Sequence, residues 1–369
     1  MGIALRLIIA DHLHPHGVGK WPGKRKHAPL PGTLPAPYSS VMASPTIARV
    51  EALLNARRFD DAAKLLIKAA SAGEAPALAE LGHWRVAGNI VRRDLSAART
   101  AFERAGAAGD RDSALLHAAF LASGVGGAAD WPGALKIVRR LAPHDPRAAQ
   151  QVRHLDAMPL DAQGIADAAP APEVLSAAPR VEVYRSLLTA QECAYLVTAG
   201  SPSLQPSVVV DPQSGRLIPH PIRTSDNTQF GVYAEDMVVN AINRRIAAIS
   251  GTAPEQGEPL QLLRYRAGGE YRAHMDALPG EPNQRVLTVI VYLNDGYEGG
   301  ETTFVRRNVT FRGRPGDAIL FANVTSDGRP DPEAQHAGLP VTKGIKLIAT
   351  RWIRGARFTF PAPNSLLPY

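Results

Sequence analysis

The chain has 369 residues, 45% of them hydrophobic and 20% charged, which is typical of a globular protein with room for two domains. The net charge is +7, but the first 45 residues contribute +4 of it (Arg6, Lys20, Lys24, Arg25 and Lys26 against Asp11), so the other 324 residues carry only +3. This balance predicts no specific nucleic-acid partner, and the lack of an apolar run of roughly 20 residues predicts no membrane span.

Residues 1–45 are rich in Pro and His and contain the tract HLHPH. We interpret them as a disordered, basic leader. The apolar stretch at 3–10 is interrupted by Arg6 and has no small-residue cleavage site after it, so it is a poor signal peptide. The single cysteine, Cys193, excludes an internal disulfide and agrees with a reducing compartment, so we expect a cytoplasmic protein.

Residues 46–157 are predicted to be helical, because apolar positions recur there at three- and four-residue spacing. The segment also matches itself at an offset of 36 residues. The matching positions are Ala62, Ala98 and Ala134, Gly73 and Gly109, Gly88 and Gly124, and Asp94 and Asp130. Small residues let paired helices approach closely, and glycines end helices by taking left-handed backbone angles.

The stretch AELGHWRVAGNIVRRDLSAARTAFERAGAAGD within this segment resembles the Sel1-like repeat, a relative of the tetratricopeptide repeat. The resemblance implies stacked helix pairs that offer a surface for protein interaction. The alternative is a helical cap that only supports the second domain.

Residues 158–180 are rich in Ala and Pro without sustained periodicity, which predicts a linker. In the domain that follows, 181–369, a strand precedes a helix with Thr189 as N-cap, and a second helix ends at Gly251. Short β-type runs separated by turn signals then predict an antiparallel sandwich or barrel. No nucleotide-binding glycine motif occurs. The fold class expected is therefore α+β and multidomain, with a helical repeat domain before a β domain.

His274 and Asp276 lie one residue apart in a β-type segment, so in a strand their side chains would converge. Such a pair suits a divalent metal or a plain His–Asp hydrogen bond. His336, 62 residues beyond His274, offers a third ligand. Two imidazoles and one carboxylate form the facial triad of non-haem Fe(II) sites, which leaves positions open for a co-substrate and O2. A structural zinc site would want four ligands, commonly thiolates, which this domain lacks.

An iron oxygenase of this kind needs electrons, and the common donor is 2-oxoglutarate. Its far carboxylate needs a buried cation to offset desolvation. Lys346, ten residues after His336, is the expected cation, and Tyr265 and Thr288 on flanking strands are expected to complete the pocket with hydroxyl donors. The alternatives are a solvated Lys346, a core Tyr265 and a Thr288 that packs within the sheet.

The domain also resembles the catalytic domain of prolyl 4-hydroxylases, which are 2-oxoglutarate/Fe(II) dioxygenases. The shared features are RYRAGGEYRAHMD, YLND with EGGET, PGDAILF, and HAGLPVTKGIK with WI, within a core at 258–357. The resemblance implies a double-stranded β-helix (jelly roll) with flanking helices, and release of succinate and CO2. It implies Fe(2+), 2-oxoglutarate and O2 as cofactor and co-substrates, with ascorbate as reductant. It assigns iron to His274, Asp276 and His336, and 2-oxoglutarate to Lys346, Tyr265 and Thr288.

We therefore expect an enzyme that hydroxylates peptidyl proline in a protein or peptide that the helical repeats recruit. The alternatives are a hydroxylase of a free amino acid or small metabolite, and a non-catalytic repeat-based interaction protein. Arg223 and Trp352 are expected to face the substrate, with a loop salt bridge and core packing as their respective alternatives. Proline rests on the resemblance alone, because hydroxylases of many substrates share the triad.

Overall fold

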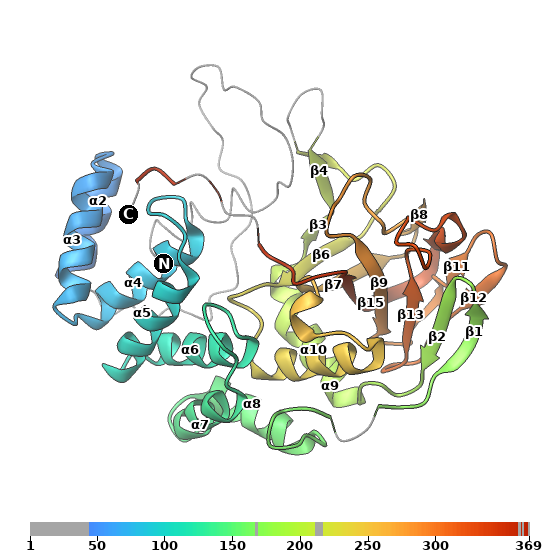
Figure 1. The fold of residues 1–369 in the computed structure, drawn as a ribbon, viewed down its shortest axis with the longest axis horizontal. Coiled ribbons are helices and arrows are strands. Elements are labelled where there is room, and N and C mark those ends of the chain that lie inside the picture. Colours follow the sequence, from blue (N-terminus) through green and yellow to red (C-terminus); the bar gives the residue numbers. More distant parts are fainter. Residues whose placement is uncertain (1–43, 167–168, 211–216, 361–362, 364, 368–369) are drawn as a thin grey trace. The chain divides into compact units, whose positions relative to one another are not determined.

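Figure 1 shows the computed structural model, which describes residues 44–166, 169–210, 217–360, 363 and 365–367. The chain divides into two compact units. The helical unit consists of Met1–Ala149 and Phe360–Tyr369, and the sheet unit consists of Gln150–Thr359. The leader expected over 1–45 lies outside the described residues except at its end, where Ser44 precedes the first helix.

The helices of the helical unit follow one another at the spacing that the sequence predicts. In chain order they are α2 (Pro45–Asn55), α3 (Phe59–Ser71), α4 (Ala75–Ala87), α5 (Leu95–Ala107), α6 (Arg111–Ser123) and α7 (Trp131–Leu141). Helices α3, α5 and α7 begin 36 residues apart, and so do α4 and α6. The helical repeat is thereby confirmed.

Capping residues make each repeat turn at the same point. Gly88 after α4 and Gly124 after α6 have positive φ angles of 72° and 70°, which end these helices. Asp94 and Asp130 then begin α5 and α7, each by accepting a hydrogen bond from a backbone N–H of the first turn.

A glycine permits the close contact between α4 and α5. Trp84, Phe102 and Phe120 are fully buried, and the rings of Phe102 and Phe120 meet edge to face with centroids 5.5 Å apart. A Cβ atom at Gly82 would come within 2.6 Å of the Phe102 ring. The glycine therefore lets α4 lie against α5 at the distance that this aromatic core requires.

The sheet unit contains a large antiparallel sheet of nine strands within the described residues. Its strands, in spatial order, are β1 (Glu173–Ala177), β2 (Arg180–Tyr184), β13 (Ala318–Ala322), β9 (Arg285–Tyr292), β15 (Val341–Arg354), β7 (Leu260–Arg266), β6 (Asp226–Phe230) and β3 (Gln205–Pro206), with β10 (Tyr297–Gly299) also paired to β15.

A smaller sheet and several helices complete this unit. The smaller sheet has the order β12 (Val309–Phe311), β11 (Thr302–Phe304), β14 (His336–Gly338) and β8 (Tyr271–His274), and a separate hairpin pairs β4 (Val208–Val210) with β5 (Leu217–Pro219). The helices are α8 (Pro146–Ala157), shared with the other unit, α9 (Ala190–Gly200), α10 (Met237–Ser250) and the short 3-10 segments Ser201–Ser203, Pro254–Gln256 and Pro332–Ala334. Figure 1 shows α9 and α10 running along one side of the large sheet.

The core of the sheet unit lies between its two sheets. Large-sheet strands contribute Val183, Tyr292 and Phe321, and small-sheet strands contribute Phe304 and Phe311. Two antiparallel sheets that face each other across such a core form a jelly roll. The expected fold class, a helical repeat domain followed by a double-stranded β-helix with flanking helices, is confirmed.

The structure differs from the expected linker at 158–180. Strand β1, whose residues lack an alternating apolar pattern, falls within that range because it pairs with β2. The amide of Gln151 on α8 also accepts a hydrogen bond from the N–H of Met237 at the start of α10, 3.3 Å away. The part of α8 from Gln150 onward therefore belongs to the sheet unit, although the sequence analysis placed it in the helical domain at 46–157. The other predicted limits of the leader and of the domains stay predictions.

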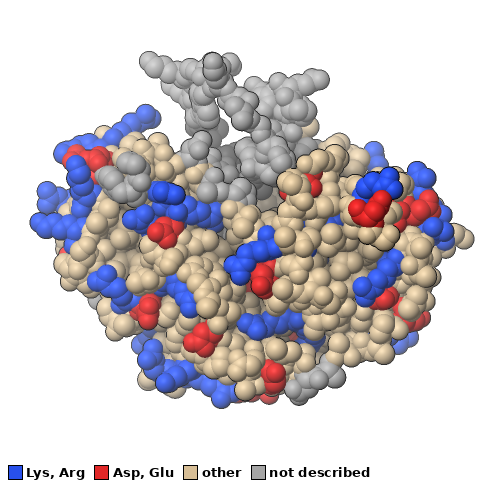
Figure 2. Space-filling model, viewed as in Figure 1, with Lys and Arg blue, Asp and Glu red and all other residues tan. Residues whose placement is uncertain are grey.

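The surface carries both signs of charge. On the face shown in Figure 2, basic and acidic side chains of the described residues are interspersed over both units. Within the described part of the chain, no helix combines the length and the apolar character that crossing a membrane requires.

A pair of glycines tests how closely the turn before β13 packs. Gly316 has φ +90°, and a Cβ there would lie 2.0 Å from the carbonyl oxygen of Leu188, whereas Gly280 has φ +70° with open space around it. In both variants the alanine has to adopt a left-handed backbone conformation, which lowers stability. Only Gly316→Ala in addition brings a side-chain atom into contact with a backbone oxygen. We expect urea unfolding to show Gly316→Ala less stable than Gly280→Ala by about 2 kcal/mol. Equal losses would contradict this packing.

Candidate metal centre and its pocket

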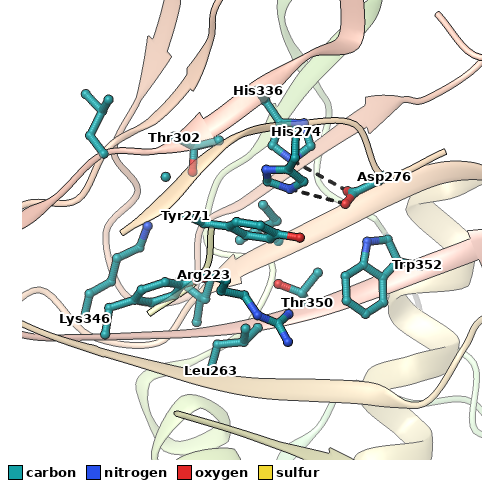
Figure 3. A pocket seen from close by; sticks show the side chains of 15 residues that line it. Arg223, Leu263, Tyr271, His274, Asp276, Thr302, His336, Lys346, Thr350 and Trp352 are labelled. Atoms are coloured by element: carbon teal, nitrogen blue, oxygen red, sulfur yellow. Dashed lines mark ion pairs between the residues drawn. The ribbon is translucent and has the colours of Figure 1, made fainter. Parts of the chain in front are cut away.

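Three side chains converge between the two sheets. His274 at the end of β8 lies directly opposite His336 at the start of β14. Their Nε2 atoms lie 3.5 and 3.7 Å from the two carboxylate oxygens of Asp276, and one ligand atom from each residue falls within 4.8 Å of the others. Figure 3 shows both imidazoles facing this carboxylate. These three form the one such group of potential metal ligands found among the described residues.

The way in which Asp276 reaches this group differs from the same-strand geometry expected from the sequence. Strand β8 ends at His274, and Asp276 lies in the bend that follows. The convergence therefore comes from the bend and from the pairing of β8 with β14, rather than from alternation along one strand.

Both imidazoles present a lone pair to the centre. Nδ1 of His274 lies 2.8 Å from the carbonyl oxygen of Arg272, and Nδ1 of His336 lies 3.1 Å from that of Ala334. Since a carbonyl only accepts hydrogen bonds, the proton of each neutral ring resides on Nδ1, and Nε2 is free to bind a metal. Burial lowers the pKa of His336 to about 4, which keeps this ring neutral near pH 7.

Asp276 supplies the negative charge. Burial by itself raises the pKa of this carboxyl, but His336 and His274 attract the carboxylate whenever their rings are protonated, and this attraction outweighs burial and lowers the pKa below its ordinary value. The hydroxyl of Thr288 donates a hydrogen bond to Oδ2 of Asp276 at 2.7 Å, and the side-chain amide of Asn323 donates to that hydroxyl at 2.8 Å. This chain of donors fixes the orientation of the carboxylate.

Aromatic rings hold the histidines in place. The ring of Tyr271 stacks on His274 with centroids 3.5 Å apart and planes 14° from parallel. The ring of Phe321 meets His336 edge-on at 4.6 Å. Because β8 carries a bulge between the residues paired with His336 and Gly338, Tyr271 lies on the same side as His274 although the two are three residues apart.

Strand β15 lines the pocket that extends from this centre. Lys346, Ile348, Thr350 and Trp352 all face it, as expected for alternate residues of one strand. Figure 3 shows Lys346 and Asp276 at opposite sides of the pocket. The pocket therefore places a cation at one end and the metal ligands at the other.

Lys346 is only 3% exposed, and burial lowers its pKa to about 8. Its Nζ donates a 2.6 Å hydrogen bond to the carbonyl oxygen of Gly300 and lies 5.6 and 5.3 Å from the ring centroids of Tyr265 and Tyr292. No carboxylate in the described residues forms an ion pair with it. A buried ammonium that retains free donors fits the carboxylate of an anionic ligand.

Of the two expected hydroxyl donors, Tyr265 lines the pocket and Thr288 does not. Tyr265 pairs with Lys346 across β7 and β15 and lines the pocket. The assignment of Thr288 to 2-oxoglutarate needs correction. Its side chain points to the same interior face, but it is fully buried, and its hydroxyl is engaged by Asp276 and Asn323. Thr288 thus orients a metal-ligand candidate instead of lining the pocket.

Arg223 and Trp352, the expected substrate-facing residues, both line the pocket. The guanidinium of Arg223 lies 5.5 Å from the ring centroid of Tyr271, and its buried Nε has no hydrogen-bond partner among the described residues. The indole N–H of Trp352 is likewise buried without a partner in the described part of the chain.

A charged cluster behind Trp352 fixes its ring. The guanidinium of Arg285 lies 3.9 Å from the ring centroid and forms two hydrogen bonds to the carboxylate of Glu258, at 2.6 and 2.9 Å. The side chain of Arg354 donates to the same carboxylate at 2.6 Å, and the N–H of Glu258 donates to the carbonyl of Trp352 at 2.8 Å. The sequence reasoning missed this support. Among the pocket residues with polar side chains, it also missed Tyr271, Thr302 and Thr350.

A jelly roll with two imidazoles and one carboxylate at its centre defines the class of mononuclear non-haem iron enzymes. A family model described as the 2OG-Fe(II) oxygenase superfamily matches residues 260–354. The chain is 35% identical over 206 residues to the probable prolyl 4-hydroxylase 10 of Arabidopsis thaliana, which covers 49% of this chain and 71% of that relative. The chain belongs to the prolyl 4-hydroxylase family of the 2OG-Fe(II) oxygenases.

Two solved structures are also similar to parts of the chain. The viral collagen prolyl hydroxylase from Paramecium Bursaria Chlorella virus-1, in its 2OG complex, is 27% identical and covers 48% of this chain and 96% of its own, with a TM-score of 0.39. A Sel1 repeat protein from Oxalobacter formigenes is 25% identical and covers 29% of this chain and 85% of its own, with a TM-score of 0.28.

The enzyme is accordingly a 2-oxoglutarate-dependent dioxygenase that uses Fe(2+), 2-oxoglutarate and O2. The residues present fit these groups. Two Nε2 lone pairs and a buried carboxylate suit a divalent iron ion, and the buried Lys346 suits the far carboxylate of 2-oxoglutarate.

The role of Thr288 can be tested by replacing it with its isostere. Thr288→Val removes the hydrogen bond to Asp276 and leaves the carboxylate less constrained, so we expect Fe(II) affinity to fall by about 10- to 100-fold in an anaerobic titration. Thr303→Val is the matched control, because its hydroxyl bonds to that of Thr310 at 3.0 Å instead. Equal iron affinity in the two variants would contradict the orienting role.

The charge of Lys346 predicts a pH dependence. The cation is present below its pKa of about 8 and is lost above it, so 2-oxoglutarate affinity should be full near pH 7 and fall as the pH rises through about 8. Calorimetry with Mn(II) in place of iron measures this without turnover. Lys346→Met should bind at least about tenfold more weakly at pH 7 and lose the fall.

The control for that titration is Lys343→Met, since Lys343 is exposed and pairs with Glu298 at 3.0 Å. It should retain the affinity and the pH profile of the unaltered chain. A pH-independent affinity in the unaltered chain would exclude Lys346 as the titrating contact.

Proposed function

We propose that the sheet unit hydroxylates a prolyl side chain in a protein or peptide, with His274, Asp276 and His336 as the iron ligands. The observation that carries this proposal is the cluster of these three side chains at one side of a pocket whose other side holds the buried Lys346. The prolyl 4-hydroxylase names of the Arabidopsis relatives support proline as the substrate.

Bound iron supplies the activation of O2 and of the substrate C–H bond, with 2-oxoglutarate converted to succinate and CO2. The protein residues position the reactants. Lys346 and Tyr265 anchor the far carboxylate of 2-oxoglutarate, so that its oxo-acid end extends toward the metal ligands. Thr288 and Asn323 hold the Asp276 carboxylate in one orientation, in which it would ligate the iron together with His274 and His336.

The chemistry of the pocket wall suits a prolyl residue. A peptide has no N–H at proline, so its hydrogen bonds in this region are made mainly by carbonyl acceptors. The wall carries the guanidinium of Arg223, which forms no ion pair among the described residues and is the group that would donate to such a carbonyl. The rings of Tyr271 and Trp352 provide apolar surface for the pyrrolidine ring.

A second candidate is a hydroxylase of a free amino acid or small metabolite. The guanidinium of Arg223 favours it, because no carboxylate pairs with this group among the described residues, and a free substrate carboxylate would. The two candidates separate in one assay. Proline-rich peptides with blocked termini and free proline are each incubated with enzyme, Fe(II) and 2-oxoglutarate, and the addition of one oxygen atom is followed by mass spectrometry.

Oxidation of the blocked peptides but not of free proline supports the peptide substrate, and the reverse result supports the metabolite. Succinate formation that neither compound stimulates would reject both.

Recruitment of the target by the helical repeats is a further part of the proposal. A reducing, cytoplasmic location is also part of it, and this location agrees with the single buried thiol of Cys193.

The iron assignment predicts the behaviour of Asp276→Ala. The change removes the negatively charged ligand, so succinate formation should fall to the background rate, by about 1,000-fold or more. Asp295→Ala, at an exposed loop position, should keep the activity of the unaltered chain. Substantial succinate formation by Asp276→Ala would contradict the assignment of the centre.

A further inference from the structure

The segment after Thr359 belongs to the helical unit rather than to the strand that it follows. The N–H groups of Leu366 and Leu367 donate hydrogen bonds to the carbonyl oxygens of Asn89 and Ile90, each at 2.9 Å. Two consecutive donors thus meet two consecutive acceptors. Leu366 and Leu367 lie in a bend, which turns both of their N–H groups toward the loop between α4 and α5.

Side chains give this contact its specificity. Leu367 packs against the apolar core of α2, α3 and α4, whereas the adjacent Leu366 is 60% exposed. At the other end of the segment, Arg93 donates a 3.5 Å hydrogen bond to the carbonyl oxygen of Phe360 and lies 5.7 Å from the centroid of its ring. Leu367 therefore anchors the segment in the apolar core, and Phe360 contacts Arg93 at the opposite end.

The receiving loop has two buried side chains and differs from its counterpart in the next repeat. Ile90 and Val91 are buried in the core of the helical unit. The residues 36 positions later are Gly126 and Gly127, and a Cβ at Gly126 would lie 2.2 Å from the carbonyl oxygen of Leu95. The second loop therefore packs its own backbone directly onto a helix, whereas the first loop holds its side chains inward and presents carbonyl groups to the added segment.

We propose that this docking edge, formed by Asn89–Arg93 and the core beneath Leu367, is a binding site for a leucine-bearing peptide that bends at its anchoring leucine. Its occupant is the end of the same chain, which contacts this edge through the described residues Phe360, Leu366 and Leu367. A partner protein that offers a peptide of the same chemistry reaches the site by displacing this segment. The proposal concerns the helical unit and is independent of the reaction that the sheet unit catalyses.

A peptide-binding experiment tests this occupancy. A synthetic peptide of residues 358–369, carrying a fluorophore, is titrated with the full chain and with a chain that ends at Thr359, both without iron. The truncated chain should bind the peptide, and the full chain should bind it at least about tenfold more weakly, because its own segment competes. A peptide with Leu367→Asp should bind the truncated chain at least about tenfold more weakly, and one with Leu366→Asp should bind like the original.

Absence of binding to a truncated chain that retains its helical circular dichroism would overturn the proposal. Equal binding to both chains would overturn occupancy by the chain's own segment. If the truncated chain does not fold, the full chain with Leu367→Asp or Leu366→Asp replaces it. Hydrogen exchange of residues 88–94 should then accelerate at least about tenfold in the first variant and stay unchanged in the second. The same exchange in both would reject Leu367 as the anchor.

Discussion

A buried carboxylate that faces two imidazole lone pairs is the constraint on which the catalytic half of the protein depends. Asp276 and the Nε2 atoms of His274 and His336 are all electron-rich, and their proximity is unfavourable unless a cation lies between them. An iron ion held by these three residues, as proposed, would resolve this conflict. The protein in turn keeps the three groups in place by backbone carbonyls on Nδ1 of both rings and by the Thr288 hydroxyl on the carboxylate.

The strands of the jelly roll position these groups relative to the pocket. The paired strands β8 and β14 bring the two histidines together, and the long strand β15 carries Lys346 and Trp352 on one face. A single strand thus carries both the proposed anchor for 2-oxoglutarate and part of the proposed wall for the substrate. The cluster of Glu258, Arg285 and Arg354 supports that wall from behind, so the indole is held by charge as well as by packing.

Much of the site can be predicted from the sequence, because its residues recur in a motif and lie at strand spacing. From Lys346, a period of two leads to Thr350 and Trp352. The role of Thr288 could not be found in this way. Its strand position correctly indicates the interior face, but the bend after β8 places Asp276 over it, and a bend of this kind leaves no periodic signal. The contact of Tyr271 with His274 could not be predicted for a related reason, because it depends on a bulge in β8 that puts both side chains on the same side.

The helical half was predictable in its repeat, because the helix ends follow glycine and aspartate positions that recur every 36 residues. The contact of Leu367 with that unit could not be predicted, because it joins residues nearly 280 positions apart. It also depends on two backbone carbonyl groups, which no residue type in the sequence reveals. Strand β1 is a similar case, as pairing with β2 rather than its own composition makes it a strand.

The most direct test of the account is an anaerobic titration of the protein with Fe(II) and 2-oxoglutarate, followed by visible absorption. Chelation of iron by 2-oxoglutarate at this centre should produce a weak charge-transfer band that His274→Ala abolishes. Iron binding without the band, or a band that persists in His274→Ala, would contradict the assignment of His274, Asp276 and His336 as the iron site.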